Sequence, residues 1–498
     1  MQAKKINKQD VFILIVLFGI NFIEMILEMA ASRVLMPYFG NSQYVWTAII
    51  GIIMLAGATG NITGGKISEY IEHKKMVAYM FLFAALAISV IPVLAPRIAK
   101  ANADLPVVSG ALLLSVYLFF LPSLFLSCIT PVVLDDYISQ KDGGVRQGVS
   151  HAAIGIGALS GTFFGGFFIV PALGVRRTLF VLSIAAICLA VITVLEEKKY
   201  KLLLSPSLVL AFILILQNGL FSYTNSQVIA EFDSEYSHIT VEEWDSYGEI
   251  KEPVRLYRSA GAYSSGAYID KNKKYDLLFE YTKKYDEALS GPDVSDDILM
   301  IGGAAYSYPK HIISNYPNKR IDVVEIDPMA EKIAKKYFYL DDLIEEYDAI
   351  NSGRLGLFSE DGRIYLQRTE KKYSAILNDA FSGGISVGSL STDEAVKTIK
   401  NHLEKDGVYA ANILASLGGK SSQFLLSELK VLENNFLHVY VIPVRTTNED
   451  EYQNIMVFAS DRELNLPESI NWEYKGNEIY LTDDNCPVDK MVKTDYYD

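Results

Sequence analysis

Cysteine is scarce in this sequence, with three among 498 residues, at Cys128, Cys188 and Cys486. They lie far apart, so they form neither the paired framework of a disulfide-rich secreted protein nor the close spacing of a metal site, and we expect no metal. A cleavable secretory signal is also missing. The first apolar stretch is too long for one, and several similar stretches follow it.

The chain has no overall excess of positive charge, because its formal net charge is -14. The charge is divided unevenly. Residues 1–222 hold 16 Lys and Arg against 11 Asp and Glu, and residues 223–498 hold 29 against 48. The two parts therefore carry +5 and -19, which indicates separate domains. A domain with so large a negative excess is a poor partner for phosphates, so we expect no nucleic acid partner.

Long apolar runs characterise residues 1–222. Seven stretches are long and apolar enough to cross a hydrocarbon core of about 30 Å, and they are Val11–Leu35, Tyr44–Thr63, Met76–Ala95, Val107–Leu134, Ala152–Leu173, Thr178–Leu195 and Leu202–Phe221. The loops on one side hold eleven Lys and Arg, against four on the other. The positive-inside rule therefore predicts a multi-pass protein of the cell membrane, in contact with the lipid bilayer, with a cytoplasmic N-terminus. Seven spans would place the C-terminal half outside.

Charged residues interrupt the first predicted span. Glu24 and Glu28 are one helical turn apart, and Arg33 follows five residues later. Since a charge is costly in lipid, we expect these side chains to face the interior of the bundle. A structural lock between Glu and Arg and a path for protons or cations are both consistent with this pattern.

From about residue 222 the pattern changes to short strands and helices. Residues 223–290 predict a β-hairpin region with strands at Ser237–Val241 and Val254–Tyr257, turn or bulge glycines at Gly261 and Gly266, and a helix at Tyr275–Leu289. Residues 291–498 alternate strands and helices and end in an antiparallel pair at His438–Val444 and Asn454–Ser460. The fold class is therefore multi-domain. An all-α transmembrane bundle precedes an α/β Rossmann-like domain, whose site lies at the carboxyl ends of its strands.

Glycines and acids follow four successive predicted strands. The pair Gly302-Gly303 ends the first, where a nucleotide could approach the start of the next helix. Glu325 ends the second, about twenty residues further along the sequence, where a carboxylate accepts hydrogen bonds from ribose hydroxyls. Asp361-Gly362 follows the third and suits the adenine amino group, and Asp379 ends the fourth, facing the reacting centre. One such acid is more often a helix cap, but four in succession favour a nucleoside site.

Several of these segments resemble the polyamine aminopropyltransferase (spermidine synthase) family. They are Ile298–Phe338, with its Ile-Gly-Gly and Val-Val-Glu-Ile-Asp-Pro motifs, Ser359–Gly362, Asn378–Ala380, Lys405–Val408 and the hairpin Glu235–Ile239. In the apolar half, Met29, Ser32-Arg33, Pro37–Gly40 and Trp46 resemble the membrane-fused branch of that family. In that branch a bundle like half of a major-facilitator transporter precedes the synthase domain.

The resemblance implies a methyltransferase-type domain that takes decarboxylated S-adenosylmethionine or S-adenosylmethionine as co-substrate. An amine attacks the methylene carbon beside the sulfonium, and methylthioadenosine leaves. By position, the nucleoside would be held by Gly302, Gly303, Glu325, Asp327, Asp361 and Gly362. Asp379 would orient or deprotonate the amine, and Tyr275 would help to position the substrate.

The departures from the family fall on the acceptor side. The acid of the family's Gly-Gly-Gly-Asp-Gly is Ala305 here and Tyr306 follows it, while the second acid of its Asp-x-x-Asp loop is Ser382. Two glutamines are also replaced, by Ser237 and Asp276. A protein binds the amino groups of a polyamine through carboxylates at fixed spacing. Because two of these carboxylates are missing here, we expect an altered acceptor site.

Three functions remain open from the sequence. The first is a membrane-anchored enzyme whose acceptor is a different amine, a lipid headgroup, or the sulfonium compound's own carboxylate or amine. The second is a non-catalytic extracytoplasmic binding or sensor module. The third is a polyamine or small-cation transporter with a regulatory domain, which as half a facilitator fold would need to form a homodimer. S-adenosyl compounds are made and kept in the cytoplasm, whereas seven spans would place the C-terminal domain outside the cell. The side of the membrane on which this domain lies therefore stays open.

Overall fold

The computed structural model describes residues 8–39, 43–102, 105, 107–138, 143–194, 227–289, 297–382 and 385–491. The chain divides near residue 224 into two compact units.

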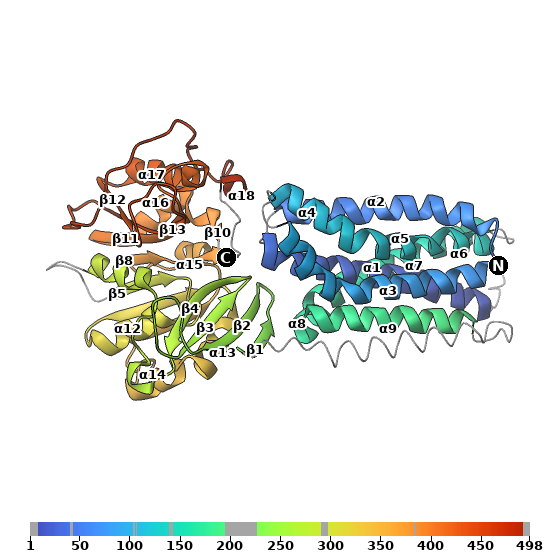
Figure 1. The fold of residues 1–498 in the computed structure, drawn as a ribbon, viewed down its shortest axis with the longest axis horizontal. Coiled ribbons are helices and arrows are strands. Elements are labelled where there is room, and N and C mark those ends of the chain that lie inside the picture. The colour runs from blue at the N-terminus through green and yellow to red at the C-terminus, as the bar shows by residue number, and fades with distance from the viewer. Residues whose placement is uncertain are drawn as a thin grey trace. The chain divides into compact units, whose positions relative to one another are not determined.

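The first unit is a bundle of helices (Figure 1). Its elements are α1 (Lys8–Phe39), α2 (Gln43–Ser68), α3 (His73–Ala101), α4 (Val107–Ser115), the π-helical turn η1 (Val116–Phe120), α5 (Leu121–Ser127), α6 (Ile129–Ile138), α7 (Gly143–Phe164), a second π-helical turn η2 (Gly165–Ile169), α8 (Val170–Leu173) and α9 (Val175–Val194). Six helical segments of the described residues are long and apolar enough to cross a membrane, and they coincide with the first six predicted spans. The seventh predicted span, Leu202–Phe221, lies outside the described residues.

Glycine allows α7 to pack closely against α1. A Cβ atom on Gly157 would lie 2.5 Å from the carbonyl oxygen of Phe18, and one on Gly161 would lie 2.6 Å from that of Phe22. Small residues let helix backbones approach in this way where water cannot drive them together. The same two helices are joined at one end, where Arg146 forms an ion pair with Asp10 at 2.8 Å.

The second unit begins with a four-stranded antiparallel sheet of β1 (Val228–Asp233), β2 (His238–Trp244), β3 (Val254–Ser259) and β4 (Ala262–Tyr268). The sequence predicted only the two central strands, because β1 has no buried residue and the burial of β4 does not alternate along the strand. Gly261 makes the predicted turn with a φ of +88°. Gly266 lies inside β4 instead, where a Cβ atom would be 2.6 Å from Leu278.

A short connection leads to the main sheet. It contains the 3-10 turn η4 (Lys271–Lys273), α11 (Glu280–Lys283) and the 3-10 helix η5 (Lys284–Leu289). The predicted helix over Tyr275–Leu289 is therefore correct only in its second half.

The main sheet has seven strands in the order β12-β13-β11-β8-β5-β6-β7. They are β5 (Asp297–Ile301), β6 (Arg320–Glu325), β7 (Leu355–Ser359), β8 (Tyr373–Asn378), β11 (Leu403–Ala415), β12 (His438–Pro443) and β13 (Gln453–Ser460). Neighbouring strands from β11 to β7 pair in parallel, and β13 runs antiparallel to both of its neighbours, β12 and β11, as predicted for the last pair. A ribbon of β9 (Phe381–Ser382) and β10 (Ile385–Ser386) follows β8.

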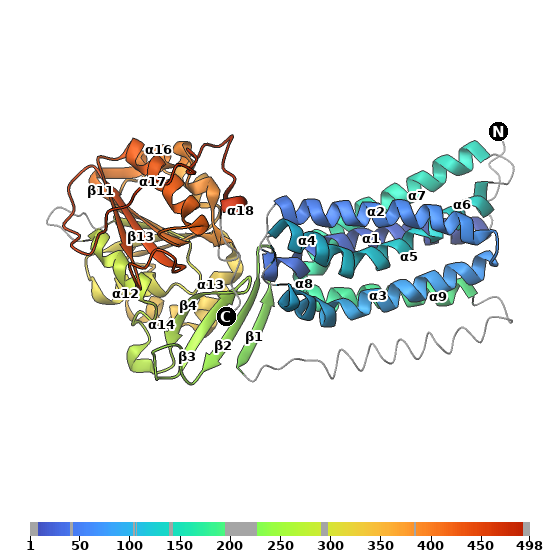
Figure 2. The ribbon, with the colours of Figure 1, turned by 45° about the horizontal axis from the view of Figure 1, so that its top comes forward.

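Helices cover both faces of this sheet (Figure 2). One face packs against α12 (Ser307–Asn315), α13 (Pro328–Tyr337) and α14 (Leu340–Glu346), and the other against α15 (Gly362–Arg368), α16 (Asp393–His402) and α17 (Gln423–Asn435). The turns η6 (Gly388–Leu390) and η7 (Lys420–Ser422) and the short α18 (Val488–Met491) complete the unit. The central residues of these strands are mostly apolar because both faces of the sheet are covered.

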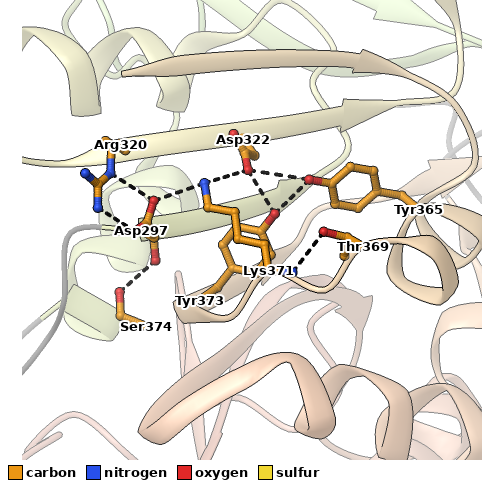
Figure 3. Close-up of polar contacts among 8 residues, drawn as sticks. All are labelled: Asp297, Arg320, Asp322, Tyr365, Thr369, Lys371, Tyr373 and Ser374. Carbon is orange, nitrogen blue, oxygen red and sulfur yellow. Dashed lines mark hydrogen bonds and ion pairs between the residues drawn. The ribbon is translucent and has the colours of Figure 1, made fainter. Parts of the chain in front are cut away.

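A polar network joins the amino ends of three parallel strands (Figure 3). The ammonium of Lys371 lies 2.9 Å from Asp322 of β6 and 3.0 Å from Asp297 of β5. Arg320 pairs with Asp297 at 2.6 Å, and the hydroxyl of Tyr373 in β8 donates to Asp322 at 2.9 Å. These contacts lie at the edge opposite the carboxyl ends of the strands, so they fix strand register rather than the candidate site.

Candidate active site

The first parallel strand ends in a turn that only glycine can make. Gly302 has a φ of +96°, and a Cβ atom on it would lie 2.5 Å from the carbonyl oxygen of Asp379. The N–H of Asp379 in turn donates to the carbonyl of Ile301 at 2.9 Å. The ends of β5 and β8 are therefore in direct contact, which brings two of the predicted site segments together.

Glu325 lies beneath this turn. Its carboxylate accepts the backbone N–H groups of Gly303 at 2.7 Å, Ala304 at 3.0 Å and Asp327 at 2.9 Å. Burial raises the pKa of Glu325, and these three hydrogen bonds oppose that rise. A carboxylate has about four lone-pair sites, so one is left for a ribose hydroxyl. Glu325 thus shapes the turn, a role that the sequence did not indicate.

Asp327 and Asp361 are both N-caps. Asp327 caps α13 through the N–H of Met329 and also accepts the hydroxyl of Ser234, which ties the small sheet to the main domain. One oxygen of Asp361 caps α15 through the N–H groups of Arg363 and Ile364, at 2.9 and 3.0 Å.

Asp361 and Gly362, at the start of α15, each have a feature that matters for ligand binding. Among the described residues, no hydrogen bond uses the second oxygen of Asp361, Oδ2. Gly362 brings α15 onto β5, because a Cβ atom there would be 2.4 Å from Ile301. Asp361 can therefore cap the helix and accept a ligand donor at the same time, whereas Asp327 is engaged on both oxygens.

Asp379, at the end of β8, is held by two side chains from other elements. Asn412 of β11 donates to Oδ1 at 2.9 Å, and Tyr281 of α11 donates to Oδ2 at 3.2 Å. Burial raises the pKa of Asp379 to about 6. Hydrogen bonds from Asn412 and Tyr281 oppose that rise, and the charge of Glu325 adds to it. An acid that titrates near neutral pH is suited to proton transfer.

The structure places Tyr275 elsewhere. Its hydroxyl donates to Glu346 of α14 at 2.8 Å, and the hydroxyl at Asp379 belongs to Tyr281. Sequence reasoning missed both Tyr281 and Asn412. Asn412 carried a usable signal, since it is a polar residue in the middle of the otherwise apolar strand β11. Tyr281 carried none, because it stands among several aromatic residues.

At position 305, where the resemblance predicts an acid of the acceptor site, this chain has an alanine. Ala305 is fully buried in an apolar cluster with Ile239 and Val241 of β2. Tyr306 is also buried, in the left-handed region at a φ of +56°, and a Cβ atom on Gly303 would lie 3.0 Å from its ring. The side chain of Ser382 lies outside the described part of the chain.

The two charged side chains at the centre of the site, Asp379 and Glu325, are both acidic. Asp379 and Glu325 lie near enough for the charge of Glu325 to raise the pKa of Asp379. In the part of the chain that the structure describes, no group of three His, Cys, Asp or Glu side chains could hold a metal ion. The geometry suits a cationic organic ligand at the carboxyl edge of the sheet, where doubly wound domains bind nucleotides.

Comparison with known proteins agrees with this class of domain. Residues 289–466 match the family model of the spermine/spermidine synthase domain. A polyamine aminopropyltransferase of Vibrio vulnificus is 28% identical over 216 residues, which cover 43% of this chain and 68% of the relative. One from Oceanobacillus iheyensis is 21% identical over 385 residues, which cover 74% of this chain and 71% of the relative, so the similarity extends into the N-terminal half. The crystal structure of spermidine synthase from Thermotoga maritima is 16% identical with a TM-score of 0.37, and the match covers 47% of this chain and 73% of that one.

The C-terminal half is therefore a spermidine synthase-like domain on a Rossmann, methyltransferase-like sheet, homologous at low identity to polyamine aminopropyltransferases. It follows a bundle of six helices that are long and apolar enough to cross a membrane, counted over the described residues.

Proposed function

We propose that this protein is a membrane-anchored transferase with an altered polyamine acceptor site. It binds an S-adenosyl sulfonium nucleoside, either decarboxylated S-adenosylmethionine or S-adenosylmethionine, and releases methylthioadenosine. The observation that carries the proposal is the position of Asp379, whose carboxylate is oriented by Asn412 and Tyr281 directly beside the Gly302 turn.

The nucleoside contacts follow from the same edge of the sheet. The Gly302-Gly303 turn has no side chain to obstruct a ligand, Glu325 keeps one lone-pair site for a ribose hydroxyl, and Oδ2 of Asp361 suits the adenine amino group. The negative charge of Asp379 and Glu325 favours a sulfonium, which is a cation.

In the proposed reaction the acceptor's lone pair forms a bond to the methylene carbon beside the sulfonium. The carbon–sulfur bond breaks, its electron pair returns to sulfur, and neutral methylthioadenosine leaves. When the acceptor is an amine, its proton passes to Asp379, whose pKa near 6 keeps it ionised at neutral pH.

The altered acceptor site is supported by the surroundings of position 305. An acid there would face the apolar cluster that now holds Ala305, and Tyr306 packs on the turn that precedes it. The acceptor is therefore a different amine, a lipid headgroup, or the sulfonium compound's own carboxylate or amine.

We also propose that the bundle crosses the cell membrane, with its N-terminus and the C-terminal domain both in the cytoplasm. S-adenosyl compounds are made there, and an even number of crossings would return the chain to the side of its N-terminus; the described residues contain six such helices. This placement requires that the seventh predicted span, Leu202–Phe221, which lies outside the described residues, does not cross the membrane. Reporter fusions after Val194 and at the C-terminus would both be active inside the cell, whereas a C-terminal fusion active only outside would contradict this placement.

The reaction is tested by incubating the purified full chain with each sulfonium compound, alone and with a panel of amines. Methylthioadenosine is then measured by chromatography. We expect its release to fall at least 100-fold in Asp379→Asn and to persist in Asp342→Asn, which changes an exposed acid on α14, outside the site. Equal release by Asp379→Asn and the wild type, or no release under any condition, would refute the assignment.

A further inference from the structure

Two carboxylates of the helical bundle, Glu24 and Glu28, form no ion pair among the described residues. Ser127 of α5 donates a hydrogen bond to Glu24 of α1 at 3.3 Å. Among the described residues, no ion pair joins Glu24 or Glu28 to a cationic side chain.

The fourth span runs antiparallel to α1 in a register that two contacts define. Ser127 lies beside Glu24, and Gly110 lies beside Phe39, where a Cβ atom on the glycine would be 2.4 Å from the ring. The residue numbers add up to 151 at the first contact and to 149 at the second, so the two segments run antiparallel, and the π-helical turn η1 lies between the two contacts. The same register places Ser123 level with Glu28, one turn from the first pair.

Ser123 is fully buried, and its hydroxyl has no hydrogen-bond partner in the described structure. It lies on the same face of α5 as Ser127, because the two residues are four positions apart. Leaving a buried hydroxyl without a partner is destabilising, so a hydroxyl with no partner among the described residues, at the level of a carboxylate with no ion pair, points to a bound ligand.

The helix around these serines is irregular, as it often is at functional positions. The π-helical turn η1 precedes α5, and α5 ends at Ser127. Pro131 has no N–H to donate to the Ser127 carbonyl, so the usual helical hydrogen bond is missing there. Gly60 of α2 makes room for Ser127, since a Cβ atom on it would lie 2.9 Å from that of the serine.

We propose that Glu24, Glu28, Ser123 and Ser127 form a binding site for a small cation inside the bundle. Carboxylate, hydroxyl and carbonyl oxygens are hard ligands, so they suit an alkali ion or an alkylammonium group rather than a transition metal. The cation offsets the cost of two carboxylates in a low-dielectric environment. The inference relies on the proposed membrane position of the bundle and is independent of the reaction in the C-terminal domain.

The test uses the full chain in lipid nanodiscs and calorimetry with three separate probes, sodium chloride, potassium chloride and 1,4-diaminobutane. We expect at least one probe to bind, and which one binds separates a metal ion from an organic cation. Glu28→Gln should weaken that binding at least 10-fold and Ser123→Ala at least 3-fold. Ser115→Ala is the matched control, because Ser115 is also buried without a partner but is level with Leu35 in the same register.

Methylthioadenosine binding to each variant serves as the folding control, and its loss in the wild type would count against the proposed reaction rather than against this site. No heat with any of the three probes would overturn the inference. So would equal weakening by Ser123→Ala and Ser115→Ala, or binding that survives unchanged in Glu28→Gln.

Discussion

The hydroxyl of Tyr281 donates a hydrogen bond to Asp379 at 3.2 Å and links α11 to the end of β8. This bond favours the ionised form of Asp379, whose pKa is about 6. Its removal in Tyr281→Phe should raise that pKa, so the acid limb of methylthioadenosine release moves to higher pH by up to about one unit.

The control for this shift is Tyr275→Phe, whose hydroxyl donates to Glu346 instead. It should leave the pH profile where it is in the wild type. A shift in the profile of Tyr275→Phe, with none in that of Tyr281→Phe, would mean that Tyr275 rather than Tyr281 governs Asp379.

Asp379 should make the stability of the C-terminal domain depend on pH. Its pKa is raised in the fold from an ordinary value of 3.8 to about 6, so its contribution to stability is present at low pH and is lost as the pH rises through 6. Asp379→Asn removes an unfavourable buried charge and should stabilise the domain at pH 8, by on the order of 2 kcal/mol. At pH 4 the difference should nearly vanish. Denaturant melts at both pH values measure this, and equal effects at pH 4 and pH 8 would contradict the assignment of the buried charge.

The glycine turn can be tested with a matched pair. Gly302 and Gly353 both have positive φ, +96° and +73°, but only at Gly302 would an added Cβ atom lie 2.5 Å from the backbone of Asp379. Gly353→Ala should therefore cost about 1 kcal/mol through strain alone. Gly302→Ala should cost more and should weaken methylthioadenosine binding at least 10-fold, because β5 and β8 must separate. Normal nucleoside affinity in Gly302→Ala would show that this turn does not line the site.

The network at the amino ends of the strands should affect stability and leave the site unchanged. Lys371→Met removes the cation between Asp297 and Asp322 and should destabilise the domain by about 1 kcal/mol, a modest value because Lys371 is partly exposed. Nucleoside affinity should change less than twofold. Lys335→Met, which breaks a single surface pair with Glu331, is the comparison and should cost less. A loss of affinity in Lys371→Met would contradict the structural role of the network.

The sequence predicted the parallel strands well because their buried apolar runs end at glycines and acids, as at Gly302 and Asp379. It predicted the small sheet poorly, since β1 has no buried residue and the burial of β4 does not alternate along the strand. The partners of Asp379 could not be predicted from local pattern, because Tyr281 and Asn412 reach it from 98 and 33 positions away. Glu325 also shapes the Gly302 turn by accepting three backbone N–H groups. Nearly every residue has a backbone N–H, so the residue types in the sequence could not indicate this role.

The central claim is that the carboxyl edge of the main sheet binds an S-adenosyl sulfonium nucleoside, and calorimetry of methylthioadenosine with the full chain tests it most directly. We predict saturable binding that Asp361→Ala weakens at least 10-fold, because Oδ2 of Asp361 is the expected adenine contact. Asp342→Ala, an exposed acid on α14, should leave the affinity unchanged. Absence of binding at millimolar nucleoside, in protein that melts cooperatively, would contradict the account.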